Sequence, residues 1–453
     1  MSKTVKLRKG LNIPLLGEAE KVKNSVEQAD VFSIKPPDFH GVMPKLDLKA
    51  GAKVKAGDVI FHNKYVENVK FCSPISGEIT EVVRGAKRRI LEIIIKADTN
   101  IDYKDLGVKD LNSMSDDEVK NYLLSSGLWP FIKQRPIDII ADPTQTPKAI
   151  FISAFDSSPI APDYDFILHG EDENFQTGID VLKKLTKGII HLNVNGDGSP
   201  DKVFTNAKGV QINKIYGKHP AGNIGTQIHH IDPLNKGEYI WTINPQDVAI
   251  IGRVFNTGKF DLSKVIALTG SEVKTPKYIK TIIGTSIKNI VENNITSDNV
   301  RIISGNVLTG DKIKPDGFLG FYANQITVIP EGNQSKFFLT DGWLGSGCSK
   351  FSISKTYFSW LMPNKKRKLD TNLNGEIRSF VVTGEMEKVF PFDIYPMQLI
   401  KSVMYEDLDE MEALGIYEVA PEDFALCEFV CTSKIDIQEK IRQGLDKVQE
   451  EIL

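Results

Sequence analysis

The chain has 453 residues, of which 41% are hydrophobic and 25% charged, enough sequence for about three domains with ordinary cores. The 56 Lys and Arg residues against 59 Asp and Glu give a net charge of -3, which excludes a broadly basic nucleic-acid binder. No apolar run reaches the ~20 residues of a membrane span, no signal peptide is recognisable, and four cysteines are too few for a disulfide scaffold. We therefore expect a soluble, cytoplasmic, multidomain α/β protein.

Residues 1–97 are rich in short Val and Ile strands separated by glycine turns. Residues 51–60 and 73–79 each place apolar residues at strand spacing beside glycines that can adopt positive φ. Together these stretches resemble the two halves of a biotinyl/lipoyl-like barrel-sandwich domain. Residues 62–67, at the expected hairpin tip, lack the Asp-Lys-Ala or Met-Lys-Met run of carrier domains. The favoured interpretation is therefore a structural or docking fold rather than a carrier.

Residues 98–260 alternate between strand and helix patterns. Residues 149–155 form a buried-strand pattern, and the helical stripe that follows is expected to end at Gly188. A second strand at 189–194 completes a βαβ unit. This order predicts a Rossmann-like α/β domain.

Two helices of the same region have clear boundary signals. Ser115 and Glu118 form a capping box in front of apolar residues at helical spacing. Further along, Asn244 can cap a helix with Pro245 in its first position and Gly258 at its end. Both helices are therefore predicted from local chemistry alone.

A nucleotide site in such a domain needs glycines between strand and helix, where the backbone approaches the phosphates. After Phe155 the chain runs through residues 156–162 without a glycine. The glycine cluster at 342–347 follows no clear strand and opens no clear helix, so an irregular linker is favoured there. The sequence therefore argues against a phosphate-binding loop.

The rest of the chain divides into three parts. Residues 261–330 combine strands with one short helix, which suggests a β-grasp, ubiquitin-like (SLBB) module. Residues 331–390 are expected to form a linker and residues 391–453 a C-terminal helical domain. The helical expectation rests on two apolar stripes, Leu399, Val403, Leu408, Met411 and Leu414, then Ile441, Leu445, Val448 and Ile452.

Two cysteines in the helical region invite comparison with ferredoxin-type clusters. Such a cluster takes four thiolates in a Cys-x2-Cys-x2-Cys-x3-Cys run. Placed on this stretch, the four positions fall on Pro421, Phe424, Cys427 and Cys431, so two ligands are missing. A buried helix is therefore favoured over a bound cluster or zinc ion.

The domain order and several short stretches resemble one family along essentially the whole chain. This is the NqrA family, the peripheral subunit of the bacterial Na+-translocating NADH:quinone oxidoreductase, which is related to the RnfC protein of the Rnf complex and to the flavin subunit of respiratory complex I. The matching stretches are residues 9–14, 84–88, 126–129, 219–222 and 303–310.

The resemblance implies a cytoplasmic subunit, peripheral to the bacterial inner membrane, in a complex that couples quinone reduction to Na+ export (EC 7.2.1.1). It implies the partner proteins NqrB to NqrF, chiefly the membrane protein NqrB, and ubiquinone or menaquinone as the substrate of the complex. NADH, FMN or FAD and Fe–S clusters would belong to other subunits. We expect no catalytic residue, cofactor or metal on this chain and no turnover by it alone.

The flavin-binding relatives hold FMN on a Gly-Gly-Ala-Gly-Phe-Pro loop, whose place here is near residues 127–131. Only Gly127 of that loop is retained. Trp129 and Pro130 would fill the space that the flavin phosphate needs. The resemblance and the missing glycines therefore both argue against a bound flavin or nucleotide on this chain.

Histidines are the remaining candidates for site chemistry. The segment 219–230 contains His219, Gly222, Gly225, His229 and His230, and we expect it to be a loop. A neutral imidazole can donate to a quinone carbonyl, and glycines allow close backbone approach. The alternative is a docking or turn loop whose histidines pair with backbone, and this alternative is favoured over quinone contact and over a zinc site.

Two further points stay open. Residues 365–368 (Lys-Lys-Arg-Lys) are interpreted as a solvated turn, with anionic head groups as the alternative partner. The alternative function is a self-contained flavin- or nucleotide-dependent oxidoreductase built on the Rossmann-like domain. The missing glycine loops and the missing cysteines argue against it.

Overall fold

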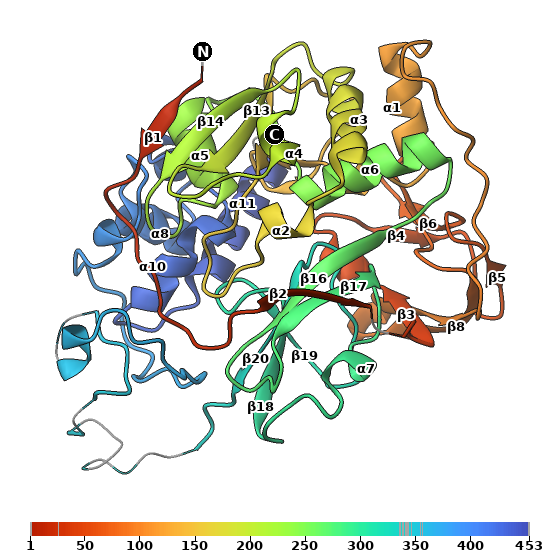
Figure 1. Cartoon of the computed structure of the whole chain (residues 1–453). Coiled ribbons are helices and arrows are strands. Elements are labelled where there is room, and N and C mark those ends of the chain that lie inside the picture. Colours follow the sequence, from red (N-terminus) through yellow and green to blue (C-terminus); the bar gives the residue numbers. More distant parts are fainter. Residues whose placement is uncertain are drawn as a thin grey trace.

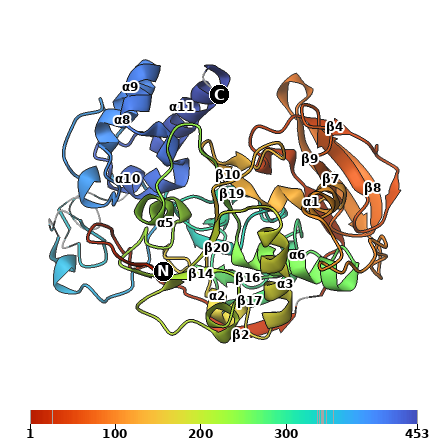
Figure 2. The ribbon, with the colours of Figure 1, turned by 90° about the horizontal axis from the view of Figure 1, so that it is seen from above.

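The computed structural model describes residues 2–451 except 26, 335, 336, 338, 340–343, 346, 354 and 356. Within these ranges the strands form four sheets (Figure 1). Seen from above, the N-terminal barrel strands and the C-terminal helices lie on opposite sides, with the two larger sheets between them (Figure 2). The short 3-10 turns are Pro36–Asp38, Ala86–Arg88, Trp129–Phe131, Phe358–Leu361, Met386–Lys388, Ile416–Glu418 and Pro421–Phe424.

The barrel sandwich consists of two small sheets around an aromatic centre. One has the order β3 (Val31–Ile34), β9 (Ile90–Ala97), β8 (Gly77–Arg84) and β5 (Lys53–Val54), and the other β4 (Pro44–Leu46), β6 (Val59–Asn63) and β7 (Lys70–Cys72). The rings of Phe61 and Phe71 stack at 4.4 Å between centroids, and Phe39 packs 4.5 Å from Phe71. Two small sheets around an apolar centre agree with the barrel-sandwich domain predicted at the N-terminal end.

The largest sheet has seven strands. Its order is β1 (Thr4–Lys6), β14 (Gln211–Tyr216), β13 (Ile189–Asn195), β12 (Ala149–Ser153), β15 (Ile240–Thr242), β10 (Lys133–Arg135) and β11 (Ile139–Ile140). Neighbouring strands are parallel from β1 to β15, whereas β10 runs antiparallel to both β15 and β11. Its helices are α1 (Asp116–Ser125), α2 (Tyr164–Ile167), α3 (Asp172–Lys183), α4 (Lys202–Thr205), α5 (Ile224–Ile231) and α6 (Pro245–Thr257).

The helix boundaries in this domain follow their local signals, with one exception. Ser115 and Glu118 form the expected capping box of α1. The Asn244 side chain caps α6, and Gly258 ends it with φ of 68°. Helix α3, in contrast, ends at Lys183, before the predicted Gly188. A Cβ at Gly188 would lie 2.6 Å from the Lys148 carbonyl carbon, so this glycine serves a close backbone approach instead.

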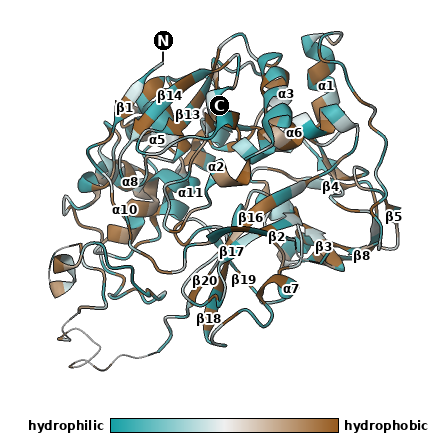
Figure 3. Cartoon of the chain, in the orientation of Figure 1, coloured by the Kyte–Doolittle hydropathy of each residue, from teal (hydrophilic) through white to brown (hydrophobic). Residues whose placement is uncertain are grey.

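The third unit is a six-stranded sheet with the short helix α7 (Lys288–Val291) beside it. Its order is β19 (Asp311–Ile313), β18 (Val300–Ser304), β20 (Gln325–Pro330), β16 (Ser263–Thr269), β17 (Lys277–Ile282) and β2 (Glu20–Ser25). The edge strand β2 is hydrophilic, while β13 and β14 of the larger sheet carry hydrophobic stretches (Figure 3). Lysines at such an edge discourage pairing with another chain.

Residues 2–25 do not pair with the barrel strands of the expected unit 1–97. Strand β1 pairs with β14 through Val5 and Ile215 in the seven-stranded sheet. Strand β2 pairs with β17 in the six-stranded sheet. The N-terminal segment therefore ties two sheets together before the barrel begins, which periodicity within the segment could not reveal.

The C-terminal part has its own apolar core. Its helices are α8 (Pro396–Tyr405), α9 (Leu408–Ala413), α10 (Ala425–Val430) and α11 (Ile437–Glu451). The predicted stripes point into this core at Leu399, Val403, Met411, Ile441, Leu445 and Val448. Ile452 lies outside the described residues.

Candidate functional site

A cavity of about 230 Å³ opens at the carboxyl ends of β12 and β15. These neighbours mark the point where the strand order reverses, because β13 and β14 continue on one side of β12 and β15 lies on the other. Ligands of open α/β sheets bind at such switch points. The lining comes from three parts of the chain, represented by Asp156 and Asp247, by Tyr322 from the loop before β20, and by Glu422 from the C-terminal part.

His219 forms one wall of the cavity and is only 4% exposed. Its Nδ1 lies 3.0 Å from Ser157 Oγ, which accepts a 2.7 Å hydrogen bond from the Gly222 N–H. Burial lowers the pKa of His219 to about 4, so the ring is neutral at physiological pH. When the Ser157 hydroxyl donates to Nδ1, the imidazole proton resides on Nε2, which can itself donate.

Two of the carboxylates in the cavity wall are Asp247, which is buried, and Asp156, which is half-buried. Burial raises the pKa of Asp156, whose Oδ1 accepts a 2.8 Å hydrogen bond from the Ser158 N–H. Burial also raises the pKa of Asp247 to about 6. Within the described part of the chain, the buried Oδ1 of Asp247 accepts no hydrogen bond. A buried carboxylate oxygen without a donor is unusual, because desolvation penalises its charge.

Aromatic and polar side chains complete the wall. The Tyr322 hydroxyl donates to the Pro130 carbonyl at 2.7 Å, and the Lys133 ammonium lies 4.7 Å from the Tyr322 ring centroid. The Tyr164 hydroxyl accepts from the side-chain amides of Asn244 and Asn324 at 2.8 and 3.1 Å. These bonds fix two phenol rings at the cavity rim.

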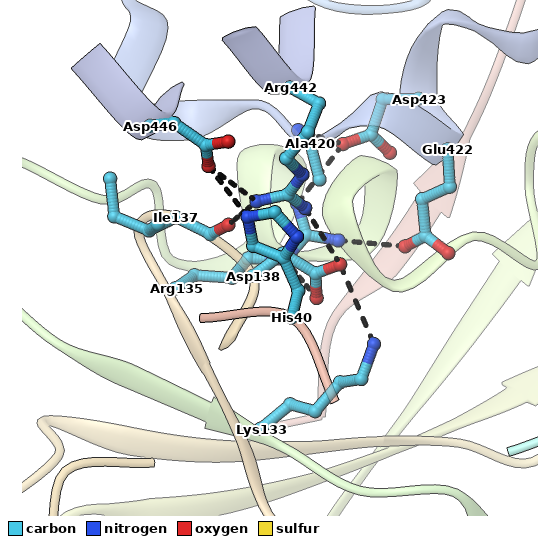
Figure 4. Close-up of polar contacts among 10 residues, drawn as sticks. All are labelled: His40, Lys133, Arg135, Ile137, Asp138, Ala420, Glu422, Asp423, Arg442 and Asp446. Carbon is cyan, nitrogen blue, oxygen red and sulfur yellow. Dashed lines mark hydrogen bonds and ion pairs between the residues drawn. The ribbon is translucent and has the colours of Figure 1, made fainter. Parts of the chain in front are cut away.

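A network of ion pairs joins the C-terminal helices to the sheet, and two of its members, Asp138 and Glu422, line the cavity (Figure 4). Arg135, with a side chain only 3% exposed, binds Glu422 at 2.7 Å, Asp423 at 3.3 Å and Asp138 at 3.6 Å. Burial opposes ionisation of Asp138, but Lys133 and Arg135 together lower its pKa to about 2. Burial raises the pKa of Asp423, which Arg135 partly offsets. The guanidinium thus joins the seven-stranded sheet to the C-terminal part.

The network extends to the barrel. Arg442 on α11 donates to the Ile137 carbonyl at 2.6 Å and lies 3.6 Å from Asp138. His40 in the barrel sandwich pairs with Asp446 on α11 at 2.7 Å (Figure 4). Ile137 adopts φ of 78°, a strained value for a β-branched residue, with its side chain in the C-terminal core.

The expected loop at 219–230 is partly helical, because residues 224–231 form α5. His219 and Gly222 line the cavity, but the other expected site residues face elsewhere. His229 binds Glu418 at 2.7 Å through Nδ1 and accepts from the Asp393 N–H at 3.0 Å. His230 binds the Thr226 carbonyl within its own helix. Of the five expected site residues, His219 and Gly222 therefore line the cavity, whereas Gly225, His229 and His230 lie on α5.

The place of the flavin loop in the related proteins is filled by packed side chains. Trp129 is fully buried and donates to the Ala141 carbonyl at 2.7 Å. Its ring makes an edge contact with Trp241 at 5.4 Å. Gly127 adopts φ of 75°, and a Cβ there would lie 3.0 Å from Cys72 Cβ. The glycine is thus used for packing against the barrel.

The cysteines and the remaining motifs also have structural positions. Cys427 and Cys431 are buried in the C-terminal core as free thiols, Cys431 just past the end of α10. Among the described residues, no three His, Cys, Asp or Glu side chains are placed to share a metal ion. In the basic run 365–368, Arg367 is 4% exposed and donates to the Ser359 carbonyl. In the glycine cluster 342–347, residues 342, 343 and 346 lie outside the described residues.

Sequence reasoning did not identify Arg135, Asp247 or Tyr322. Asp247 occupies the first turn of α6, where an acid is common for helix stability and so carries no signal of a cavity. Arg135 lies in a short strand, and its partners are 287 and 288 residues away. The only sequence signal for this ion-pair network was a single arginine close to apolar residues. Every helix in the described part of the chain is too short or too polar to cross a membrane.

The known proteins that are similar to this chain cover 99% of it. Family models described as the NqrA N-terminal barrel-sandwich hybrid domain, second alpha/beta domain and C-terminal (SLBB) domain match residues 5–98, 114–260 and 265–314. The NqrA protein of the Na(+)-translocating NADH-quinone reductase from Pasteurella multocida is 34% identical over 451 residues, covering 99% of this chain and 100% of the relative. The Neisseria meningitidis serogroup A protein of the same name is 35% identical over 450 residues, with the same coverage of both chains.

The likeness to solved structures is slight. An NAD+-reducing [NiFe]-hydrogenase matches 51% of this chain and 52% of its own with 11% identity and a TM-score of 0.34. The matched relatives are named as subunits of one reductase, of class EC 7.2.1.1, which does not favour a self-contained oxidoreductase. From the full-length identity and the three domain matches together, the chain belongs to the NqrA family of the Na+-translocating NADH-quinone reductase.

Proposed function

We propose that this subunit lies on the cytoplasmic side of the bacterial inner membrane, docked chiefly on the membrane protein NqrB among its partners NqrB to NqrF. It supports quinone reduction coupled to Na+ export without a flavin or Fe–S cluster of its own. NADH, FMN or FAD and the Fe–S clusters belong to the other subunits, and the isolated chain has no turnover. The names of the relatives support the membership in a complex, and the packed Trp129 supports the absence of a flavin from that loop.

We also propose that the α/β domain is Rossmann-like and that residues 391–453 act as a separate helical domain after a linker at 331–390. The order β14-β13-β12-β15 supports the first point, because it reverses at β12 as a doubly wound sheet does. The separate apolar core of the C-terminal helices supports the second. We also propose unit boundaries at 97, 260 and 330. Strands β1 and β2 are exceptions to the first unit, because they pair with the two larger sheets.

The cavity at this reversal is the proposed point of contact with ubiquinone or menaquinone. The observation that carries this proposal is His219, a buried neutral imidazole in the cavity wall, held by Ser157 at 3.0 Å. Its Nε2–H can donate to a quinone carbonyl, and Phe131 and Phe155 offer apolar walls for the ring. The volume of about 230 Å³ is small beside the ~300–1,000 Å³ of typical ligand pockets, which favours a quinone head group over a whole dinucleotide.

His219→Ala in the assembled complex tests the contact. Loss of one neutral hydrogen bond is worth about 0.5–1.5 kcal/mol, so quinone reduction should slow roughly threefold to tenfold. NADH oxidation by an artificial acceptor should persist, because it bypasses the quinone. His169→Ala is the matched control, since the His169 side chain is 77% exposed and pairs with Asp201 at the surface. Unchanged quinone kinetics in an intact complex would remove His219 from the site.

A further inference from the structure

The polar groups of the cavity are biased towards hydrogen-bond acceptors. Asp247 is only 3% exposed, and its Oδ1 has no donor within the described residues. Asp138, Asp156 and Glu422 add three more carboxylates to the lining. Glu422 is held by Arg135 from outside the cavity, so that guanidinium is already engaged.

Several donors in the lining are already engaged by other groups of the protein. The Lys133 ammonium lies 3.5 Å from Asp138 and over the Tyr322 ring, and the Tyr322 proton is used by the Pro130 carbonyl. The amide of Asn244 donates to Tyr164. A ligand that brings its own donor would therefore satisfy Asp247, whereas a ligand with acceptors alone would leave this carboxylate unpaired and more desolvated.

The two redox forms of a quinone differ in this property. A quinone carries two carbonyl oxygens and only accepts hydrogen bonds, whereas its quinol carries two hydroxyls and donates. A hydroxyl donating to a carboxylate forms a charge-assisted bond, which is stronger than a bond between neutral groups. Building on the quinone contact proposed above, we propose that this cavity binds the quinol form in preference to the quinone, with the Asp247 carboxylate accepting a hydrogen bond from one quinol hydroxyl.

The position of His219 is compatible with this assignment. Its neutral ring donates through Nε2 to either a carbonyl or a hydroxyl oxygen, so it contributes to both redox forms alike. The carboxylates separate them, because a carboxylate accepts from the hydroxyl and repels the carbonyl, and Asp247 does so chiefly because its Oδ1 has no donor among the described residues. The site thus retains product in preference to substrate.

Anaerobic calorimetry on the purified full-length chain provides the test. The probes are a ubiquinol with one isoprene unit, the matching ubiquinone and the dimethyl ether of the same quinol, which has the ring but no donors. At pH 8 the wild-type chain should bind the quinol about tenfold more tightly than the quinone, and the ether no better than the quinone. This comparison needs no variant and so does not depend on how a variant folds.

Asp247→Asn then assigns the preference to its residue. An amide both donates and accepts, so the quinol-to-quinone ratio should fall to threefold or less, while Asp232→Asn, outside the cavity, should keep the wild-type ratio. Equal or tighter binding of the quinone by the wild type, or of the ether relative to the quinol, would overturn the proposal and leave the quinone contact standing. Absence of binding by all three probes would overturn both.

Discussion

Asp423 occupies the space that a side chain on residue 225 would need. A Cβ at Gly225 would lie 2.7 Å from Asp423 Cγ, and both carboxylate oxygens would be closer still. Gly225 stands in the first turn of α5, and Asp423 comes from the 3-10 turn that leads into α10. The positive end of a helix dipole thus faces a buried carboxylate of the C-terminal part.

Gly225→Ala should loosen this contact. Because Asp423 is fully buried, it cannot swing into solvent, and overpacking of this kind costs about 1–3 kcal/mol. Urea unfolding should report that loss. Gly198→Ala is the matched control, because its Cβ would lie at ordinary distances of 3.6–3.8 Å from Asn195 and should leave stability within about 0.5 kcal/mol. Equal stability of both variants would show that Asp423 moves freely.

Arg135→Met should destabilise the chain much more. Removal of the guanidinium leaves Asp423 buried without its cation and Glu422 without its partner, and breaking a buried pair costs about 3–5 kcal/mol. Adding Asp423→Asn should restore part of the loss, because the buried charge is then gone.

Lys236→Ala is the matched control for Arg135→Met. Lys236 pairs with Glu412 at 2.7 Å, but the lysine is 58% exposed, so its loss should cost at most about 1 kcal/mol. A similar small loss for Arg135→Met in thermal and urea unfolding would mean that the C-terminal part does not depend on the network.

Local chemistry predicted a large part of the fold. The capping box at Ser115, the Asn244 cap and the Gly258 terminator all lie within a few residues of the feature they determine, and each is confirmed. The βαβ unit was equally readable, because an apolar run, a helical stripe and a second apolar run follow one another. In each case the sequence signal and the structural cause are adjacent.

Pairing between residues far apart in the chain could not be predicted from the sequence. Strand β1 joins its sheet through a partner about 210 residues away, and Arg135 meets carboxylates almost 290 residues away. The helix α5 was missed because Gly222 just before it and Gly225 in its first turn resemble loop residues, although one permits packing on Ser157 and the other on Asp423. The candidate site was therefore only half predicted, through His219 and Gly222.

Cys427→Ser tests the interpretation of the C-terminal cysteines as core residues. Cys427 is fully buried, and a hydroxyl without a partner in that core should cost about 1–3 kcal/mol. Cys348→Ser, at a half-exposed position, should have little effect. Anaerobically purified wild type and Cys427→Ser/Cys431→Ser should both be colourless and free of iron. Stoichiometric iron in the wild type would contradict this interpretation.

The neutral His219 should make the chain sensitive to acid. Its pKa of about 4 in the folded state lies below the ordinary 6.5, so the folded state binds fewer protons between these values. Its contribution is therefore complete above pH 6.5 and is lost as the pH falls towards 4. At pH 5 the loss should be about 2 kcal/mol, which is 1.5 pH units at 1.36 kcal/mol each.

Urea unfolding at pH 7.5 and pH 5 measures this loss directly. Burial also lowers the pKa of His191 to about 4, so the wild type should lose stability through both histidines. His219→Gln removes only one of them, and the difference in pH dependence between variant and wild type isolates His219. His169→Gln, at the exposed ring, should follow the wild type. An identical pH dependence for His219→Gln would mean that His219 becomes protonated in the folded state, and it would no longer be a neutral donor in the cavity.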